Sequence, residues 1–210
     1  NGEINQRGSV LTLAWTGDPL TPFEPALPVD GPVQVNRLDP DDVGLHTIPV
    51  LPLGYTATSE ILSRMTGEMA PGEWQGGLPM PYRLTGGDEL TVRVRVNQPK
   101  ALTRATMVVG TLEGSDFPDE WMILGAHYDP WGFGAVDPNG GTAMLLTLAE
   151  ALGELAEEGC RPRRSILIAH WDAEEYGVIG STEWVEEFLE PLTTGAVAYI
   201  NADAAVSGGF

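Results

Sequence analysis

This chain is poor in cysteine and has no long apolar run, and its N-terminus does not show the pattern of a leader sequence. Its single cysteine, Cys160, excludes an internal disulfide framework and a cysteine-rich zinc site. No run of apolar residues reaches the roughly 18 needed to span a bilayer, and the N-terminus has neither the charged nor the apolar region of a secretory leader. We therefore expect the chain to begin within a longer protein or after processing, with any targeting signal outside it.

Basic residues are also scarce, at 11 against 30 acidic residues, which gives a formal net charge of -19 at pH 7. This charge repels nucleic acid and anionic membrane surfaces, so we expect neither as a partner, and it favours cations. A solvated acidic surface accounts for most of the charge. Carboxylates at the ends of buried strands need a further explanation, because ligands of open α/β sheets bind outside the carboxyl ends of the strands.

The first part of the chain, residues 1–101, is rich in proline and glycine. Its pattern indicates a small β-rich domain with irregular connections and no catalytic motif. The expected elements are a short helix over residues 58–65 and strands over residues 10–15, 48–53 and 91–96. Polar loops in such a domain are natural places for contacts to a substrate or to a neighbouring domain.

The second part, residues 102–210, alternates strands with helices. The expected strands cover residues 106–114, 120–128, 165–171 and 196–203, and the expected helices cover residues 140–158 and 181–189. The continuous apolar run SILIAHW suits a strand covered on both faces. This order predicts an α/β fold with a mixed sheet that carries helices on both faces.

The first candidate site residues lie at the end of the strand over residues 120–128. A neutral imidazole such as His127 is a good zinc ligand, and Asp129 lies on the same side of an extended chain, where it can orient the ring. A lone histidine at a strand end is more often structural, so this pair is weak by itself. Asp137, in the glycine-flanked loop GFGAVDPNGG, is either a metal ligand or a turn or helix-start aspartate.

The pair Glu174-Glu175 is the most informative dipeptide of the chain. Two adjacent carboxylates after a buried strand are costly in a partly dry cleft unless a cation or a shared proton compensates, although an exposed turn also tolerates them. One of the two can bind metal while its neighbour takes a proton from water. Asp203 ends a further strand, and this imidazole and carboxylate set suits zinc, with manganese and cobalt fitting the same geometry.

These motifs resemble one known family. Residues 125–187, with GDPLTP at residues 17–22 and RPRRSIL at residues 161–167, look like the glutamate carboxypeptidase II family of co-catalytic zinc peptidases. The pattern WDAEE-(Y/F)-G-x-x-GSTEW is highly specific, and the likeness covers nearly the whole chain. The resemblance implies that residues 1–101 are the C-terminal part of a protease-associated domain and residues 102–210 the N-terminal part of a zinc peptidase domain, which is therefore incomplete.

The resemblance also assigns roles to the candidate residues. It implies two zinc ions bridged by Asp137, with His127 and Asp203 as the other ligands of one ion and Glu175 as a ligand of the second. It makes Glu174 the general base and acid, with Asp129 just outside the metal ligands. The remaining zinc ligand of the family is a histidine downstream of these motifs, so we expect the 210 residues to be inactive alone.

Neither of the two other histidines matches that last ligand. His46 lies in the upstream part, and His170 lies within a strand, at a position that holds a small residue in the family. The resemblance further implies a calcium ion held by main-chain oxygens of Thr21 and Glu24 and by Glu183 and Glu186, one helical turn apart. A solvated helix face is the alternative reading of the two last residues.

The expected function is therefore zinc-dependent exopeptidase activity of the carboxypeptidase or dipeptidase type on a peptide substrate. The alternative is a non-catalytic, receptor-like or binding module of the same fold. An asparagine that contacts substrate in glutamate-specific members matches Ser9, a candidate substrate contact, which leaves glutamate specificity open. The resemblance implies a homodimer of the full-length parent and an exported, periplasmic or membrane-anchored extracellular location.

Overall fold

A computed structural model describes residue 10 and residues 12–206 of the chain. In this part of the chain, no helix is both long enough and apolar enough to cross a membrane. The described residues divide into two compact units. One consists of residue 10 and residues 47–101, and the other combines residues 12–46 with residues 102–206. The assignment of residues 1–101 and 102–210 to two named domain types stays a prediction.

The unit of residues 47–101 holds little regular structure. It contains α1 (Tyr55–Leu62), the short 3-10 helix η1 (Gly72–Trp74) and one isolated antiparallel bridge between Met69 and Arg83. The predicted helix is confirmed, about three residues earlier than expected.

The strands predicted over the first 101 residues are wrong where the structure describes them. Residues 12–15, 48–53 and 91–96 are not strands. The alternation of residues 91–96 has the period of a strand, but a strand forms only when a neighbour accepts its backbone hydrogen bonds. None of the described segments pairs with these residues, so the expectation of a β-rich region fails there.

The second unit is built around a four-stranded mixed sheet with the order β1-β3-β2-β4. β1 pairs antiparallel with β3, whereas β2, β3 and β4 run parallel. The strands are β1 (Val108–Leu112), β2 (Phe117–His127), β3 (Arg164–Trp171) and β4 (Ala196–Asn201). His127 stands opposite Trp171, and Gly125 stands opposite Asn201. The carboxyl ends of the three parallel strands therefore meet at one edge of the sheet.

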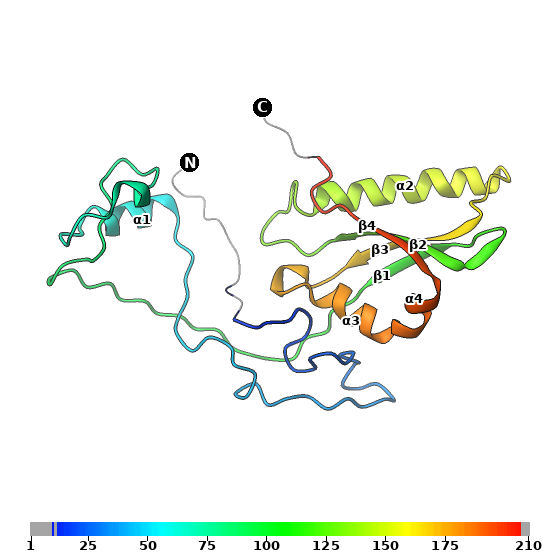
Figure 1. Cartoon of the computed structure of the whole chain (residues 1–210), viewed down its shortest axis with the longest axis horizontal. Helices are drawn as coiled ribbons and strands as arrows, with labels where there is room; N and C mark the ends of the chain where they lie inside the picture. Colours follow the sequence, from blue (N-terminus) through cyan, green and yellow to red (C-terminus); the bar gives the residue numbers. More distant parts are fainter. Residues whose placement is uncertain (1–9, 11, 207–210) are drawn as a thin grey trace. The chain divides into compact units, whose positions relative to one another are not determined.

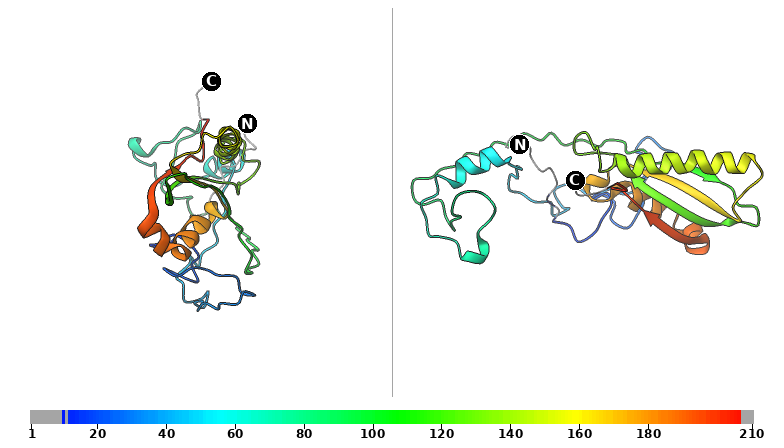
Figure 2. Two further views of the ribbon diagram at one scale, coloured as in Figure 1. Left: turned by 90° about the vertical axis from the view of Figure 1, so that its right-hand side faces the viewer. Right: turned by 90° about the horizontal axis from the view of Figure 1, so that it is seen from above.

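Helices cover both faces of this sheet, as predicted (Figures 1 and 2). α2 (Asn139–Glu157) lies on one face, and α3 (Ile179–Glu187) and α4 (Leu189–Gly195) lie on the other. α2 agrees with the predicted helix within one residue at each end. The helix predicted over residues 181–189 is instead two short helices that meet at Phe188.

Aromatic side chains fill the space between the sheet and α3. The ring of Trp171 lies 5.3 Å from that of Trp184, which in turn lies 5.1 Å from Phe188. The Trp171 indole N–H donates to the Tyr199 hydroxyl at 2.9 Å, so its polar atom is satisfied inside the core. This packing fixes the end of β3, and with it the turn that follows.

Gly141 brings the start of α2 against the segment after β4. Its N–H donates to the Asp203 carbonyl at 2.8 Å. A Cβ at this position would lie 1.9 Å from the Ala202 carbonyl oxygen, so only glycine permits the approach. The loop before α2 and the segment after β4 are therefore held together at the edge where the parallel strands end.

Candidate metal centre

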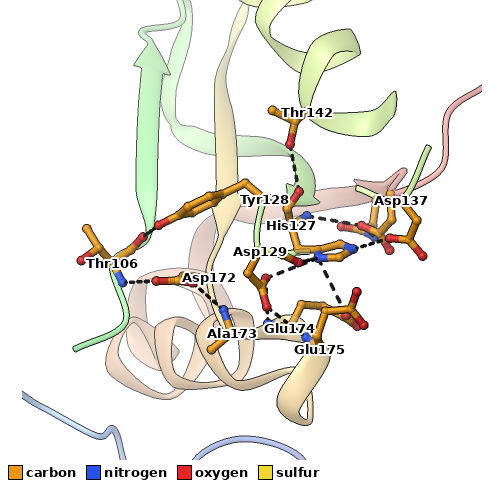
Figure 3. Close-up of polar contacts among 12 residues, drawn as sticks. Thr106, His127, Tyr128, Asp129, Asp137, Thr142, Asp172, Ala173, Glu174 and Glu175 are labelled. Atoms are coloured by element: carbon orange, nitrogen blue, oxygen red, sulfur yellow. Dashed lines mark hydrogen bonds and ion pairs between the residues drawn. The ribbon is translucent and has the colours of Figure 1, made fainter. Parts of the chain in front are cut away.

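Three potential metal ligands converge at this edge (Figure 3). His127 ends β2, Asp137 lies in the loop before α2, and Glu175 lies in the 3-10 helix η2 (Glu174–Tyr176) after β3. One ligand atom from each of the three side chains lies within 4.8 Å of the others. The structure thus brings together three of the four predicted zinc ligands in a group that could hold a metal ion.

The imidazole of His127 is 2% exposed and faces oxygen atoms on both of its nitrogens. Its Nδ1 lies 3.1 Å from the Asp129 carbonyl and 3.3 Å from that residue's Oδ1, while Nε2 lies 2.8 Å from Asp137 Oδ1. Burial alone would lower the pKa of His127, but the surrounding carboxylates, Asp137 first, raise it above its ordinary value. Positive charge is therefore favoured at this point, and a divalent cation would supply it.

Asp129 ties the histidine to the two glutamates. Its Oδ1 accepts a hydrogen bond from the backbone N–H of Glu174 at 3.0 Å, and its Oδ2 accepts one from Glu175 at 3.2 Å. Ala173 adopts a left-handed conformation (φ 58°) that reverses the chain directly after β3. The turn and the carboxylate together direct the glutamates toward the ring of His127, and the role of Asp129 just outside the metal ligands stays a prediction.

Both glutamates have a raised pKa. Burial is the main cause for Glu174, and the nearby carboxylates of Asp203 and Glu175 add to it against the opposing effect of His127. For Glu175, burial comes first and the charge of Asp137 second. The Glu174 carboxylate lies 3.9 Å from Nδ1 of His127 and is about one-third exposed, so solvent reaches it.

Asp203 lies beside the group, but it is not one of the three converging ligands. Its Oδ1 accepts hydrogen bonds from the His127 backbone N–H at 3.4 Å and from the Asn201 side-chain amide at 2.8 Å. Its charge is close enough to raise the pKa values of His127 and Glu174. Its role as a zinc ligand stays a prediction.

Several supporting contacts were not predicted. The hydroxyl of Thr142 donates to the His127 carbonyl at 2.9 Å, and the hydroxyl of Tyr128 donates to the Thr106 carbonyl at 2.6 Å. The carboxylate of Asp172 accepts hydrogen bonds from the N–H groups of Thr106 and Ala173 (Figure 3). No sequence pattern indicates which residues form these hydrogen bonds. The one hint is Asp172, which lies just before the paired glutamates.

The predicted calcium ligands also gather in the second unit. Glu183 is only 7% exposed, and its carboxylate accepts the N–H groups of Asp18 at 2.5 Å and Ala26 at 2.6 Å. A solvated helix face therefore does not describe this residue. Burial raises the pKa of Glu183, and burial followed by the charge of Glu24 raises that of Glu186.

Two buried oxygen atoms near this second group have no hydrogen-bond partner among the described residues. They are the hydroxyl of Thr21 and Oε2 of Glu186. The predicted main-chain contributors lie in a turn in which the Glu24 N–H donates to the Thr21 carbonyl at 3.2 Å. Of the other sequence candidates, Ser9 lies outside the described residues, and neither His46 nor His170 belongs to the three-ligand group.

With this geometry established, comparison with known proteins decides the family, since residues 107–210 match peptidase family M28. The chain belongs to peptidase family M28. Aminopeptidase NAALADL1 of Mus musculus is 43% identical over 211 residues, which cover 96% of this chain and 27% of that protein. The glutamate carboxypeptidase 2 homolog of Caenorhabditis elegans is 40% identical over 205 residues, 94% of this chain and 26% of that protein.

A plant relative has a similar identity and a similar coverage. The probable glutamate carboxypeptidase VP8 of Zea mays is 41% identical over 207 residues, 97% of this chain and 28% of that protein. The M28 chain thus spans about a quarter of the length of these relatives. M28 is a family of metallopeptidases and implies zinc as the metal, and an imidazole with two carboxylates is a ligand set that fits zinc.

Proposed function

We propose that this M28 chain carries the first part of the active site of a zinc-dependent exopeptidase of the carboxypeptidase or dipeptidase type. In this proposal His127, Asp137 and Asp203 would hold one zinc ion, and Asp137 and Glu175 would hold the other. The convergence of His127, Asp137 and Glu175 within 4.8 Å is the observation that carries the proposal. The names of the relatives support peptide-bond hydrolysis and differ in the terminus attacked.

Zinc in such a site polarises a carbonyl group and makes water more acidic. Glu174 is the group placed to move the proton. Its carboxylate is solvent-accessible and close to the ligands, and its raised pKa makes it a better proton acceptor than an ordinary carboxylate. We assign it the transfer of a proton from the attacking water to the leaving amine, with Asp129 holding its backbone in place.

The test is peptidase activity with and without metal. We expect the complete protein to hydrolyse peptides, to lose activity on treatment with a chelator and to regain it on addition of Zn²⁺. The 210-residue chain, which lacks the proposed downstream histidine, should show no activity under the same conditions. A complete protein that folds, contains no zinc and hydrolyses no peptide would instead be the binding module considered as the alternative.

We also propose that Glu183 and Glu186 help to bind Ca²⁺, with main-chain oxygens of Thr21 and Glu24. The proposal is supported by the buried carboxylate of Glu183, by the raised pKa values of both glutamates and by the buried, unpartnered Oε2 of Glu186. Buried carboxylates prefer a cation close by, and oxygen-only ligands suit Ca²⁺.

This calcium proposal predicts a stability change. Millimolar Ca²⁺ should raise the melting temperature of the chain, because a ligand that binds only the folded state stabilises it. In Glu186→Gln the increase should largely disappear, whereas the exposed Glu187→Gln, on the same helix, should keep it. Thermal unfolding followed by circular dichroism with and without Ca²⁺ measures both, and equal increases in the two variants would contradict the assignment.

A further inference from the structure

One aromatic pair joins the two segments that carry the metal ligands. Trp131 belongs to the loop that leads to Asp137, and Tyr176 follows Glu174 and Glu175 at the end of η2. The two rings lie with centroids 5.0 Å apart and planes inclined at 55°, a tilted aromatic contact. The segments are about 45 residues apart along the sequence and meet only through tertiary contacts such as this one and the hydrogen bonds of Asp129.

The other anchors of the loop lie at its own end, where the Asn139 N–H and side-chain amide donate to loop carbonyls and Pro138 is buried. Within residues 130–137, Trp131 is the one residue with a side chain that is not exposed, and Phe133 is fully exposed. The side chain of Asp137 is 62% exposed and approaches Nε2 of His127 at 2.8 Å. Trp131 therefore contacts the glutamate turn through its ring.

Electrostatics tends to separate the same two segments. Asp137 and Glu175 offer carboxylate oxygens that lie within 4.8 Å of one another. Like charges at short range repel, and this repulsion acts whenever no cation is bound. A non-polar contact between the segments opposes the repulsion without adding charge to the site.

We propose that Trp131 and Tyr176 are positioning residues that clamp the Asp137 loop against the Glu174-Glu175 turn and thereby strengthen cation binding. The identity of the cation rests on the proposed zinc function. The contact between the two rings is present without a metal ion, so it is tested separately from zinc binding.

The first test is zinc affinity of the 210-residue chain, measured by competition with a chromophoric chelator. Trp131→Ala and Tyr176→Ala should each raise the Kd for Zn²⁺ about tenfold, as is usual when a group that orients metal ligands is lost. Trp131→Phe keeps a ring and should restore binding to within about threefold of the original chain. The double alanine variant should bind little worse than either single variant, because both remove one interaction.

A matched control is Trp74→Ala, which removes an exposed tryptophan from the other unit and should leave the Kd for Zn²⁺ unchanged. The second test is hydrogen exchange in the metal-free chain. Trp131→Ala should speed exchange at the amides of Glu174 and Glu175, which bond across the two segments to Asp129. The melting temperature should change little, since the pair lies outside the buried core of the sheet.

The two tests separate the possible failures. If the original chain binds Zn²⁺ and Trp131→Ala changes neither the Kd nor the exchange rates, the clamp is wrong and the proposed function stands. If the original chain binds no Zn²⁺ but Trp131→Ala speeds exchange, the ring contact stands and its proposed effect on cation binding by this chain is wrong, while the proposed function is decided by zinc and activity in the complete protein. Weaker Zn²⁺ binding that Trp131→Phe fails to restore would contradict a role for the ring contact.

Discussion

The Glu174→Gln variant of the complete protein is expected to bind zinc normally and to hydrolyse peptides about 10²–10⁴-fold more slowly, the usual cost of removing a general base. Glutamine keeps the size of the side chain but cannot accept a proton from water. Since the backbone N–H of Glu174 makes the hydrogen bond to Asp129, the substitution should leave the turn in place. The measurement is kcat at saturating substrate, with the zinc content of the same sample determined in parallel.

The matched control is Glu190→Gln, which removes one exposed carboxylate from the start of α4. Its kcat should equal that of the unmodified protein, which rules out a general effect of reduced negative charge. Near-normal turnover of Glu174→Gln with zinc bound would show that another group moves the proton.

Asp129→Ala is expected to weaken zinc binding about 10–100-fold, the range for groups that orient metal ligands. The carboxylate faces Nδ1 of His127 and accepts the N–H groups of Glu174 and Glu175. Its removal therefore loosens two of the proposed ligands and the base in one step. The Kd for Zn²⁺, measured by chelator competition in the 210-residue chain, checks this expectation.

Asp116→Ala provides the comparison for Asp129. Asp116 also pairs with side chains, but it lies just before β2, at the opposite end of that strand from His127. Its loss should leave the Kd for Zn²⁺ unchanged. An Asp129→Ala chain that melts normally and binds Zn²⁺ as tightly as the Asp116→Ala chain would contradict the orienting role.

Much of the site could be predicted because strand ends carry the signal. His127 and the Glu174-Glu175 pair each follow a continuous apolar run, and parallel strands place such residues at one edge of the sheet. These residues are far apart along the chain, so the sequence does not show directly that they lie close together. Asp137 was harder to judge from its loop alone, and the structure brings it within 2.8 Å of His127.

Other features depend on tertiary contacts that no local pattern reports. Pro118 precedes the strand expected over residues 120–128, yet it lies within β2 at an irregular stretch between Phe117 and Trp121, where a missing N–H is tolerated. The seven residues of α4 lack a distinct helical pattern and went unpredicted. The ring contact of Trp131 with Tyr176 joins two segments outside the strands and α-helices. The strand and helix periods of apolar residues therefore could not reveal it.

The expected strands of the first part failed for a related reason. In residues 91–96 apolar and polar residues alternate as in a half-buried strand, but this alternation does not show whether a neighbouring strand is present to pair with it. By contrast, β3 pairs on both sides with described strands, and it was predicted almost to the residue.

Anomalous diffraction at the zinc edge, from crystals of the complete protein, tests the central claim most directly. We predict two zinc peaks at the carboxyl edge of the sheet, with ligand atoms about 2.0–2.2 Å away. One peak should contact His127, Asp137 and Asp203, and the other should contact Asp137 and Glu175. The absence of zinc at this edge, or zinc that does not touch Asp137, would contradict the account.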